Sequence, residues 1–163
     1  MEASVASGPE YRRVRNEEAW ILNNAADAIF GDRNTDQYNM TLRGTVTFTR
    51  ELTLQLYGQV FLAKGSYSQY RRLQGVSTFT PVSPTIALLD ELTRKDFNRK
   101  SLNSNVVLRW EYLPGSTLFL VWSQARGEEG YSTVTNFSAD FDDTFRIAPS
   151  NVLLFKASYL LNL

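Results

Sequence analysis

Apolar and polar residues alternate almost without exception from Tyr38 to Thr49. Such a period of two, in a segment enriched in β-branched residues, mainly threonine, is typical of a β-strand with two different faces. A strand of about 12 residues extends ~40 Å and, tilted about 45°, covers ~28 Å, which matches the ~25 Å apolar band of a membrane β-barrel. Strands of globular proteins average only about 5 or 6 residues. The length of this segment therefore favours a membrane barrel.

The same alternation returns in four later segments. Together they predict an all-β, antiparallel up-and-down meander with about five long strands, at 38–49, 51–63, 103–112, 117–126 and 151–163. Pro114 and Gly115 predict a tight turn, because proline presets φ and glycine accepts a positive φ. The last segment alternates up to Leu163, so we expect the chain to end on a strand. Residues 1–37 are too charged around 11–16 for a lipid-facing strand, and we expect the remnant of a preceding strand or extracellular loop there.

The predicted connections alternate in length. Those at 49–51 and 113–116 are short, whereas those at about 17–37, 64–102 and 127–150 are long. Outer-membrane barrels have short periplasmic turns and longer extracellular loops, so this pattern predicts the C-terminal portion of a transmembrane barrel, residues 38–163. About five strands cannot close such a barrel, because an open edge in hydrocarbon leaves backbone groups unpaired. We therefore expect upstream strands of the same barrel, absent from this chain, or an assembly of several copies.

Composition removes most familiar chemistries. Seventeen basic residues balance seventeen acidic ones, so we expect no nucleic acid as a partner. The chain has neither cysteine nor histidine, which excludes thiolate zinc sites, thiol nucleophiles and the usual general base near neutral pH. We expect no enzyme activity, no cofactor and no metal. The first ten residues do not read as a secretory signal peptide. No apolar run approaches the roughly 20 residues of a membrane-spanning helix, so membrane insertion would use strands.

Several motifs resemble one known family. The core of the resemblance is Arg109-Trp-Glu-Tyr112, Pro114-Gly-Ser-Thr-Leu118 and Val121-Trp-Ser-Gln124, and the segments 54–61, 65–68 and 151–156 are also similar. In this order the motifs resemble the C-terminal barrel of the family called domain of unknown function 5916, over about Phe30 to Leu163. The resemblance implies a barrel in the outer membrane of Gram-negative bacteria, in contact with outer-membrane lipid. It also implies a preceding domain similar to a family 9 carbohydrate-binding module, through which the protein would meet carbohydrate.

The polar faces of the predicted strands supply the candidate site. In a barrel these residues would line the lumen: Arg43, Gln55, Gln59, Arg109, Glu111 and Lys156. They could bind or pass a polar solute, since lumen residues tune selectivity. They could equally pair their charges and fill a plugged interior, for instance Arg109 with an acid on a neighbouring strand. The sequence favours this second interpretation, because the pore diameter depends on strands that the chain lacks.

Other polar residues give weaker signals. A calcium site at Asp140, Asp142 and Asp143 would need the glycine and glutamate of a defined loop motif, so a solvated loop is favoured. Glu128 and Glu129 suggest a glycosidase pair, but nothing fixes their distance from a second acid. The segment 64–102 carries aromatic and cationic residues that could stack on sugars or form a lid, and its part 86–92 is expected to form one or two helical turns.

Three functional hypotheses follow. The first is an outer-membrane barrel segment that anchors a glycan-binding domain and passes a solute. The second is a soluble, lipocalin-like binding protein, in which the leucines at 52, 54, 56, 118 and 120 point inward. The third is part of a glycan-processing hydrolase, whose paired acids this chain does not visibly supply. The first two differ in which face of each strand meets water.

Overall fold

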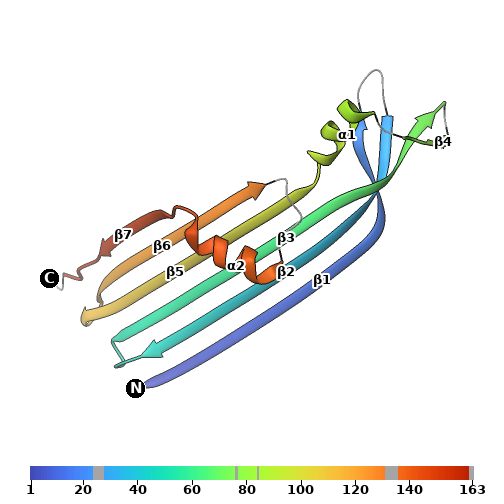
Figure 1. Cartoon of the computed structure of the whole chain (residues 1–163). Coiled ribbons are helices and arrows are strands. Elements are labelled where there is room, and N and C mark those ends of the chain that lie inside the picture. Colours follow the sequence, from blue (N-terminus) through green and yellow to red (C-terminus); the bar gives the residue numbers. More distant parts are fainter. Residues whose placement is uncertain (24–27, 76, 84, 131–135, 162–163) are drawn as a thin grey trace.

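One antiparallel sheet accounts for most of the molecule (Figure 1). The computed structural model describes residues 1–23, 28–75, 77–83, 85–130 and 136–161. Within these ranges the sheet has the strand order β1-β2-β3-β5-β6-β7, and β4 pairs with the end of β3. The strands are β1 (Glu2–Asn23), β2 (Ala28–Thr47), β3 (Leu52–Gln74), β4 (Thr78–Pro81), β5 (Phe97–Leu113), β6 (Ser116–Gly130) and β7 (Ser150–Ala157). The predicted all-β antiparallel meander is confirmed.

The N-terminal segment is more regular than the remnant of a strand or loop that we expected. β1 pairs with β2 along its whole length, and β2 begins ten residues before the expected start. The charges that argued against a lipid-facing strand are matched across this pair: Arg13 Nε lies 3.0 Å from Asp36 Oδ1, and Arg33 donates to Glu17. Seven strands, instead of about five, therefore form the described sheet.

The long connections are shorter than predicted, because three strands continue into them. β3 runs to Gln74, β5 begins at Phe97 and β6 runs to Gly130. Helix α1 (Ile86–Thr93) confirms the helical turns expected at 86–92, whereas α2 (Phe137–Arg146) replaces part of the loop expected at 127–150. The short links are confirmed, and Gly115 has the positive φ of 77° that the second turn requires. Among the described residues, no helix is long and apolar enough to cross a bilayer.

The last strand is shorter than predicted. β7 ends at Ala157, and one more residue, Ser158, exchanges backbone hydrogen bonds of 2.8 and 3.1 Å with Thr117. The Leu160 amide then donates to the Ser116 hydroxyl at 3.0 Å, so the chain folds over the β5–β6 turn. After Ser158, this side-chain contact takes the place of strand pairing. Residues 162 and 163, part of the predicted strand, lie outside the described residues.

The sheet has two chemically different faces. The register aligns Val46, Leu54, Leu108, Leu120 and Phe155 in one row, and Val5, Gly44, Leu56, Val106, Trp122 and Leu153 in the next. We call this side the apolar face. Leu42, on the same side, is 47% exposed, Leu56 is 42% exposed and Trp122 is 41% exposed. No protein layer therefore covers this part of the apolar face within the described residues.

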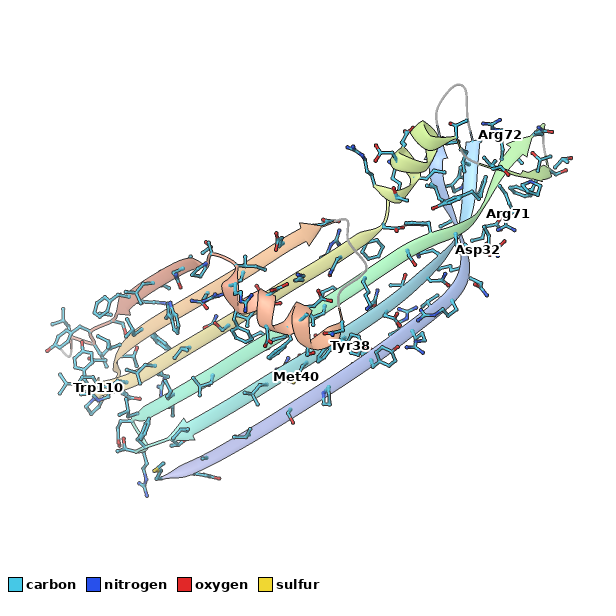
Figure 2. The ribbon with its side chains drawn as sticks, in the orientation of Figure 1. Asp32, Tyr38, Met40, Arg71, Arg72 and Trp110 are labelled. Carbon is cyan, nitrogen blue, oxygen red and sulfur yellow. The ribbon has the colours of Figure 1, made fainter. Side chains whose placement is uncertain are left out.

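Aromatic rings mark two levels of the apolar face. Tyr11 and Tyr38 stack with ring centroids 4.6 Å apart, and Trp110 lies near the turns at the opposite end (Figure 2). We call the apolar face between these levels the apolar belt. A strand of 20 residues extends roughly 66 Å, so even at a 45° tilt it exceeds a ~25 Å apolar band. The strands thus continue well past the belt.

Beyond the tyrosine pair, β1, β2, β3 and α1 share a small core. Ile21, Leu22, Ile29 and Leu92 pack together, with Tyr67 and Tyr70 against them. Arg71 Nη2 binds Asp32 Oδ1 at 2.6 Å beside this core, and Figure 2 places both residues where the strands bend away with α1. This end of the sheet is therefore a folded extension stabilised by its own apolar and ionic contacts.

Helix α2 lies against one face of the sheet, over β3, β5 and β6 (Figure 1). Its contacts with Tyr38 and Lys100 place it on the apolar side. The Asn136 side chain caps the helix by accepting a hydrogen bond from the Ala139 amide at 2.9 Å. Buried Asp140 accepts a hydrogen bond from Asn98 Nδ2 at 2.9 Å and lies 3.4 Å from Lys100 Nζ. Lys100 also binds Asp143 at 3.1 Å. A buried charge cluster therefore fixes α2 to β5.

The polar face as candidate functional site

The opposite side of the sheet carries the candidate lumen residues. Here the register aligns Ala6, Arg43, Tyr57, Asn105, Ser123 and Val152 in one row, and Ser4, Thr45, Gln55, Val107, Val121 and Leu154 in a neighbouring row. We call this side the polar face. Alternation along the strands also places Gln59, Arg109, Glu111 and Lys156 on it, so all six candidates share one face.

Two of the six candidates contact one tyrosine, and a third lies on the same face nearby. The guanidinium carbon of Arg43 lies 5.6 Å from the ring centroid of Tyr57, which is a cation–π distance. The Tyr57 hydroxyl donates to Gln59 Oε1 at 3.0 Å. Gln59 Nε2 in turn donates to Asn39 Oδ1 at 2.9 Å. Gln55, two residues from Tyr57 on the same face, is exposed. The middle of β2 and β3 thus presents a connected set of polar side chains.

The other three candidates lie nearer the turns. Arg109 Nη2 donates to Glu111 Oε2 at 3.2 Å, and Glu111 Oε1 accepts a hydrogen bond from the Gly115 amide at 3.1 Å. Arg109 does pair with an acid, as predicted. The acid, however, lies on the same strand as Arg109 and not on a neighbouring strand. Lys156 lies in the same row as Arg109, but Phe119 of β6 stands between them.

Two shallow hollows open on the polar face. One of about 360 Å³ is lined by Arg43, Thr45, Gln55, Tyr57 and Asn105. The other, of about 250 Å³, adjoins it at Tyr57 and Asn105 and continues to Asn103 and Ser123. Guanidinium, amide and hydroxyl groups suit hydrogen bonding to a polar solute. The polarity fades at β7, where Val152 and Leu154 lie on this face.

The site residues that the prediction left out are Tyr57, Asn39 and Asn105. All three lie at positions that strand alternation assigns to the same face as the six candidates, so the alternation alone could have identified them.

The weaker candidates have structural partners. Asp140 and Asp143 bind Lys100, and no group of three or more acidic side chains within the described residues is placed to hold a metal ion. Glu129 binds Arg99 at 2.8 Å, whereas Glu128 is opposite Lys100 and therefore points to the other face. In the segment 64–102, Tyr67 and Tyr70 pack on the small core and Arg71 binds Asp32, with the Phe79 ring against Phe30.

Comparison with known proteins places the chain in one family. Neither the curated proteins nor the solved structures gave a match. The model of the family described as Domain of unknown function (DUF5916) matches residues 2–163, which includes both faces of the sheet and all six candidate residues. The chain therefore belongs to the DUF5916 family.

Proposed function

We propose that this chain is a segment of a transmembrane β-barrel in the bacterial outer membrane. The observation that carries the proposal is the apolar belt, where large side chains of neighbouring strands are exposed together, among them Leu42, Leu56, Trp110, Leu120, Trp122 and Phe155. A soluble monomer rarely exposes a continuous apolar surface of this kind. Lipid acyl chains would cover it without any further protein layer.

The polar face would then line the barrel interior. Arg43 and Gln59 contact Tyr57, and Gln55 lines the same hollow. Arg109, Glu111 and Lys156 lie nearer the turns, so a polar solute would meet both charged and amide groups. Lumen residues of these kinds set the selectivity of outer-membrane barrels. The role we assign to the segment is membrane anchoring, with passage of a polar solute and association with glycan through a carbohydrate-binding domain outside this chain.

The edges of the sheet agree with this proposal. Within the described residues, β1 and β7 each pair on one side only. Unpaired backbone groups cost several kcal/mol each in hydrocarbon, so both edges need partners in a membrane. Further strands of the same barrel, outside this chain, would supply them.

The two other hypotheses receive less support. A soluble lipocalin-like protein would enclose its leucines, but Leu120 is 37% exposed and Leu56 is 42% exposed on an open sheet. A glycosidase needs two carboxyl groups that face one substrate. Glu128 and Glu129 point to opposite faces, and the second is bound to Arg99.

Cysteine labelling tests the two-sided environment. The chain has no native cysteine, so single replacements on adjacent residues of β3, Gln55→Cys and Leu56→Cys, report on the polar and the apolar face. Both positions are exposed on the sheet itself. With the protein in phospholipid vesicles, we expect a charged, membrane-impermeant maleimide to modify Gln55→Cys readily and to leave Leu56→Cys unmodified.

The same two variants in urea, where both must react, serve as the control. Equal labelling at both positions in vesicles would contradict lipid contact of the apolar face. Protection at both positions would contradict a water-filled interior.

A further inference from the structure

An apolar groove runs between α2 and the sheet at the upper limit of the apolar belt. It has a volume of about 240 Å³ and is lined by Tyr11, Tyr38, Met40, Leu62, Phe137 and Phe141. The Tyr38 ring lies 4.5 Å from that of Phe137, and Met40 on the groove floor is 47% exposed. Figure 2 shows Tyr38 and Met40 beneath the helix. The groove is continuous with the belt and offers a hydrocarbon chain contact on several sides.

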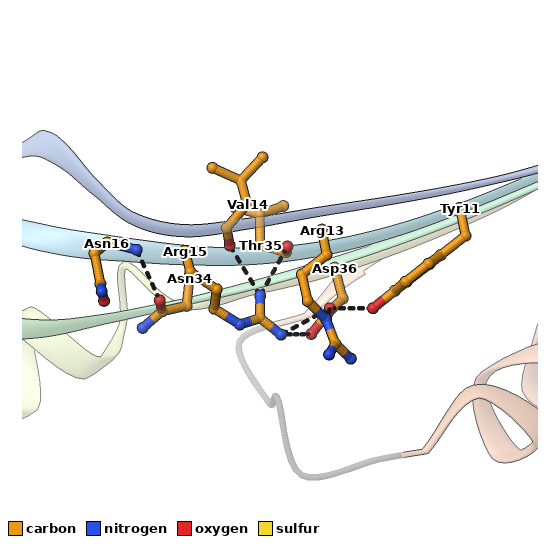
Figure 3. Close-up of polar contacts among 8 residues, drawn as sticks. All are labelled: Tyr11, Arg13, Val14, Arg15, Asn16, Asn34, Thr35 and Asp36. Carbon is orange, nitrogen blue, oxygen red and sulfur yellow. Dashed lines mark hydrogen bonds and ion pairs between the residues drawn. The ribbon is translucent and has the colours of Figure 1, made fainter.

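Two arginines lie directly above this groove. Arg13 Nε and Arg15 Nη2 bind the same carboxylate, that of Asp36, at 3.0 and 2.9 Å (Figure 3). The Tyr11 hydroxyl also donates to Asp36, at 2.8 Å, and the Arg13 guanidinium lies 5.4 Å from the Tyr11 ring centroid. One carboxylate thus faces two guanidinium groups, and their side chains are 59% and 40% exposed. This arginine pair therefore carries net positive charge and can still be reached by an anion.

The groove and the arginine pair form one continuous surface. A small hollow between them is lined by Asp36, Tyr38 and Leu62, and also by Lys64 and Asp140. A polar hollow lined by Arg15, Asp36 and Lys64 adjoins it. The junction lies at the tyrosine pair, where amphipathic rings would meet lipid headgroups in a membrane. Phosphate oxygens accept charge-assisted hydrogen bonds from arginine, and the groove below suits an acyl chain.

We propose that this surface binds a phosphate-bearing membrane lipid, with its headgroup at Arg13 and Arg15 and one acyl chain in the groove beneath α2. The proposal rests on the proposed membrane location of the chain and adds a specific lipid site to it. Free phosphate would use only the arginine pair, and a neutral lipid would use only the groove. A phospholipid from the adjoining leaflet uses both.

Native mass spectrometry of the full chain in detergent micelles tests the site. The probes are phosphatidylglycerol, a diacylglycerol with the same acyl chains, and inorganic phosphate. We expect phosphatidylglycerol to be retained about tenfold more tightly than the diacylglycerol, since a charge-assisted contact of this kind supplies that much selectivity. Replacing both arginines, Arg13→Gln with Arg15→Gln, should abolish the preference. Asp36→Asn should strengthen it, because the competing carboxylate charge is removed.

Arg12→Gln is the matched control, because Arg12 is the neighbour on β1 that points to the polar face. It should leave the preference unchanged. The opposite sign of the Asp36→Asn effect separates loss of the site from misfolding, and circular dichroism of each variant verifies the sheet.

Equal retention of the two lipids, or binding of inorganic phosphate as tight as that of the phospholipid, would overturn the proposal. An effect of Arg12→Gln equal to that of the double replacement would also overturn it, because net charge alone would then explain the preference. The cysteine labelling described above keeps the two proposals distinguishable. If Gln55→Cys and Leu56→Cys label differently while the lipids are retained equally, the lipid site is wrong and the barrel proposal stands.

Discussion

Replacing Leu42 by arginine should destabilise the protein in lipid vesicles by about 2 to 4 kcal/mol, the cost of arginine on the lipid face near the bilayer midplane of a barrel. Leu42 lies between Met40 and Gly44 on the apolar face and is 47% exposed. On a water-exposed surface, a substitution at such a position usually changes stability by within about 0.5 kcal/mol. The large expected effect therefore arises from lipid alone. Urea unfolding in vesicles, followed by tryptophan fluorescence, measures it.

Thr41→Arg provides the comparison, because Thr41 is the preceding residue of β2 and points to the polar face. An arginine there would remain hydrated in the lumen, so its cost should be much smaller. If both substitutions were equally tolerated, the two faces would share one environment and the proposed membrane location would be wrong.

Removing the cation under α2 should have an effect of similar size. Lys100→Ala leaves the Asp140 carboxylate buried, since the Lys100 side chain is only 11% exposed and that of Asp140 only 5% exposed. Loss of one partner from a buried ion pair costs about 3 to 5 kcal/mol, because the remaining charge is not compensated. We expect α2 to detach from β5 before the sheet unfolds. Hydrogen–deuterium exchange of residues 137–146 would then increase strongly.

Arg99→Ala is the control for this variant. Arg99 is the adjacent residue, on the other face, and its ion pair with Glu129 is more than half exposed at both side chains. Exposed pairs contribute no more than about 1 kcal/mol. Unchanged exchange in α2 after Lys100→Ala would mean that the other contacts of the helix, such as the hydrogen bond from Asn98 to Asp140 and the ring contact of Phe137 with Tyr38, hold it without the ion pair.

The sequence predicted the two faces of the sheet well but misjudged its extent. Alternation between 38 and 62 was sufficient, because each side chain's face follows from the period of a strand. It was not sufficient for β1, whose charged residues are acceptable in a strand only because Asp36 and Arg33 lie opposite, and pairing partners are not visible in one segment. Helix α2 did leave a signal, in the capping Asn136 and the phenylalanines spaced four residues apart.

In the candidate site, too, alternation predicts the face of each residue but not its contacts. One polar face for Arg43, Gln55 and Gln59 follows from strand phase alone, whereas the contacts within it depend on how far each side chain reaches across the register. Tyr57 is central because its ring lies beside Arg43 and its hydroxyl reaches Gln59. Arg109 turns to Glu111 along its own strand, which the spacing of two allows but does not require.

The strands also shorten steadily across the second half of the sheet, from 23 residues in β3 to 17 in β5, 15 in β6 and 8 in β7. One end of the sheet therefore extends much farther along β1, β2 and β3 than along β7. If β7 paired directly with β1, its eight residues would meet a strand of twenty-two, and most backbone groups on that edge of β1 would stay unpaired. A neighbour that pairs with the outer edge of β1 along its whole length would therefore have to be a much longer strand than β7.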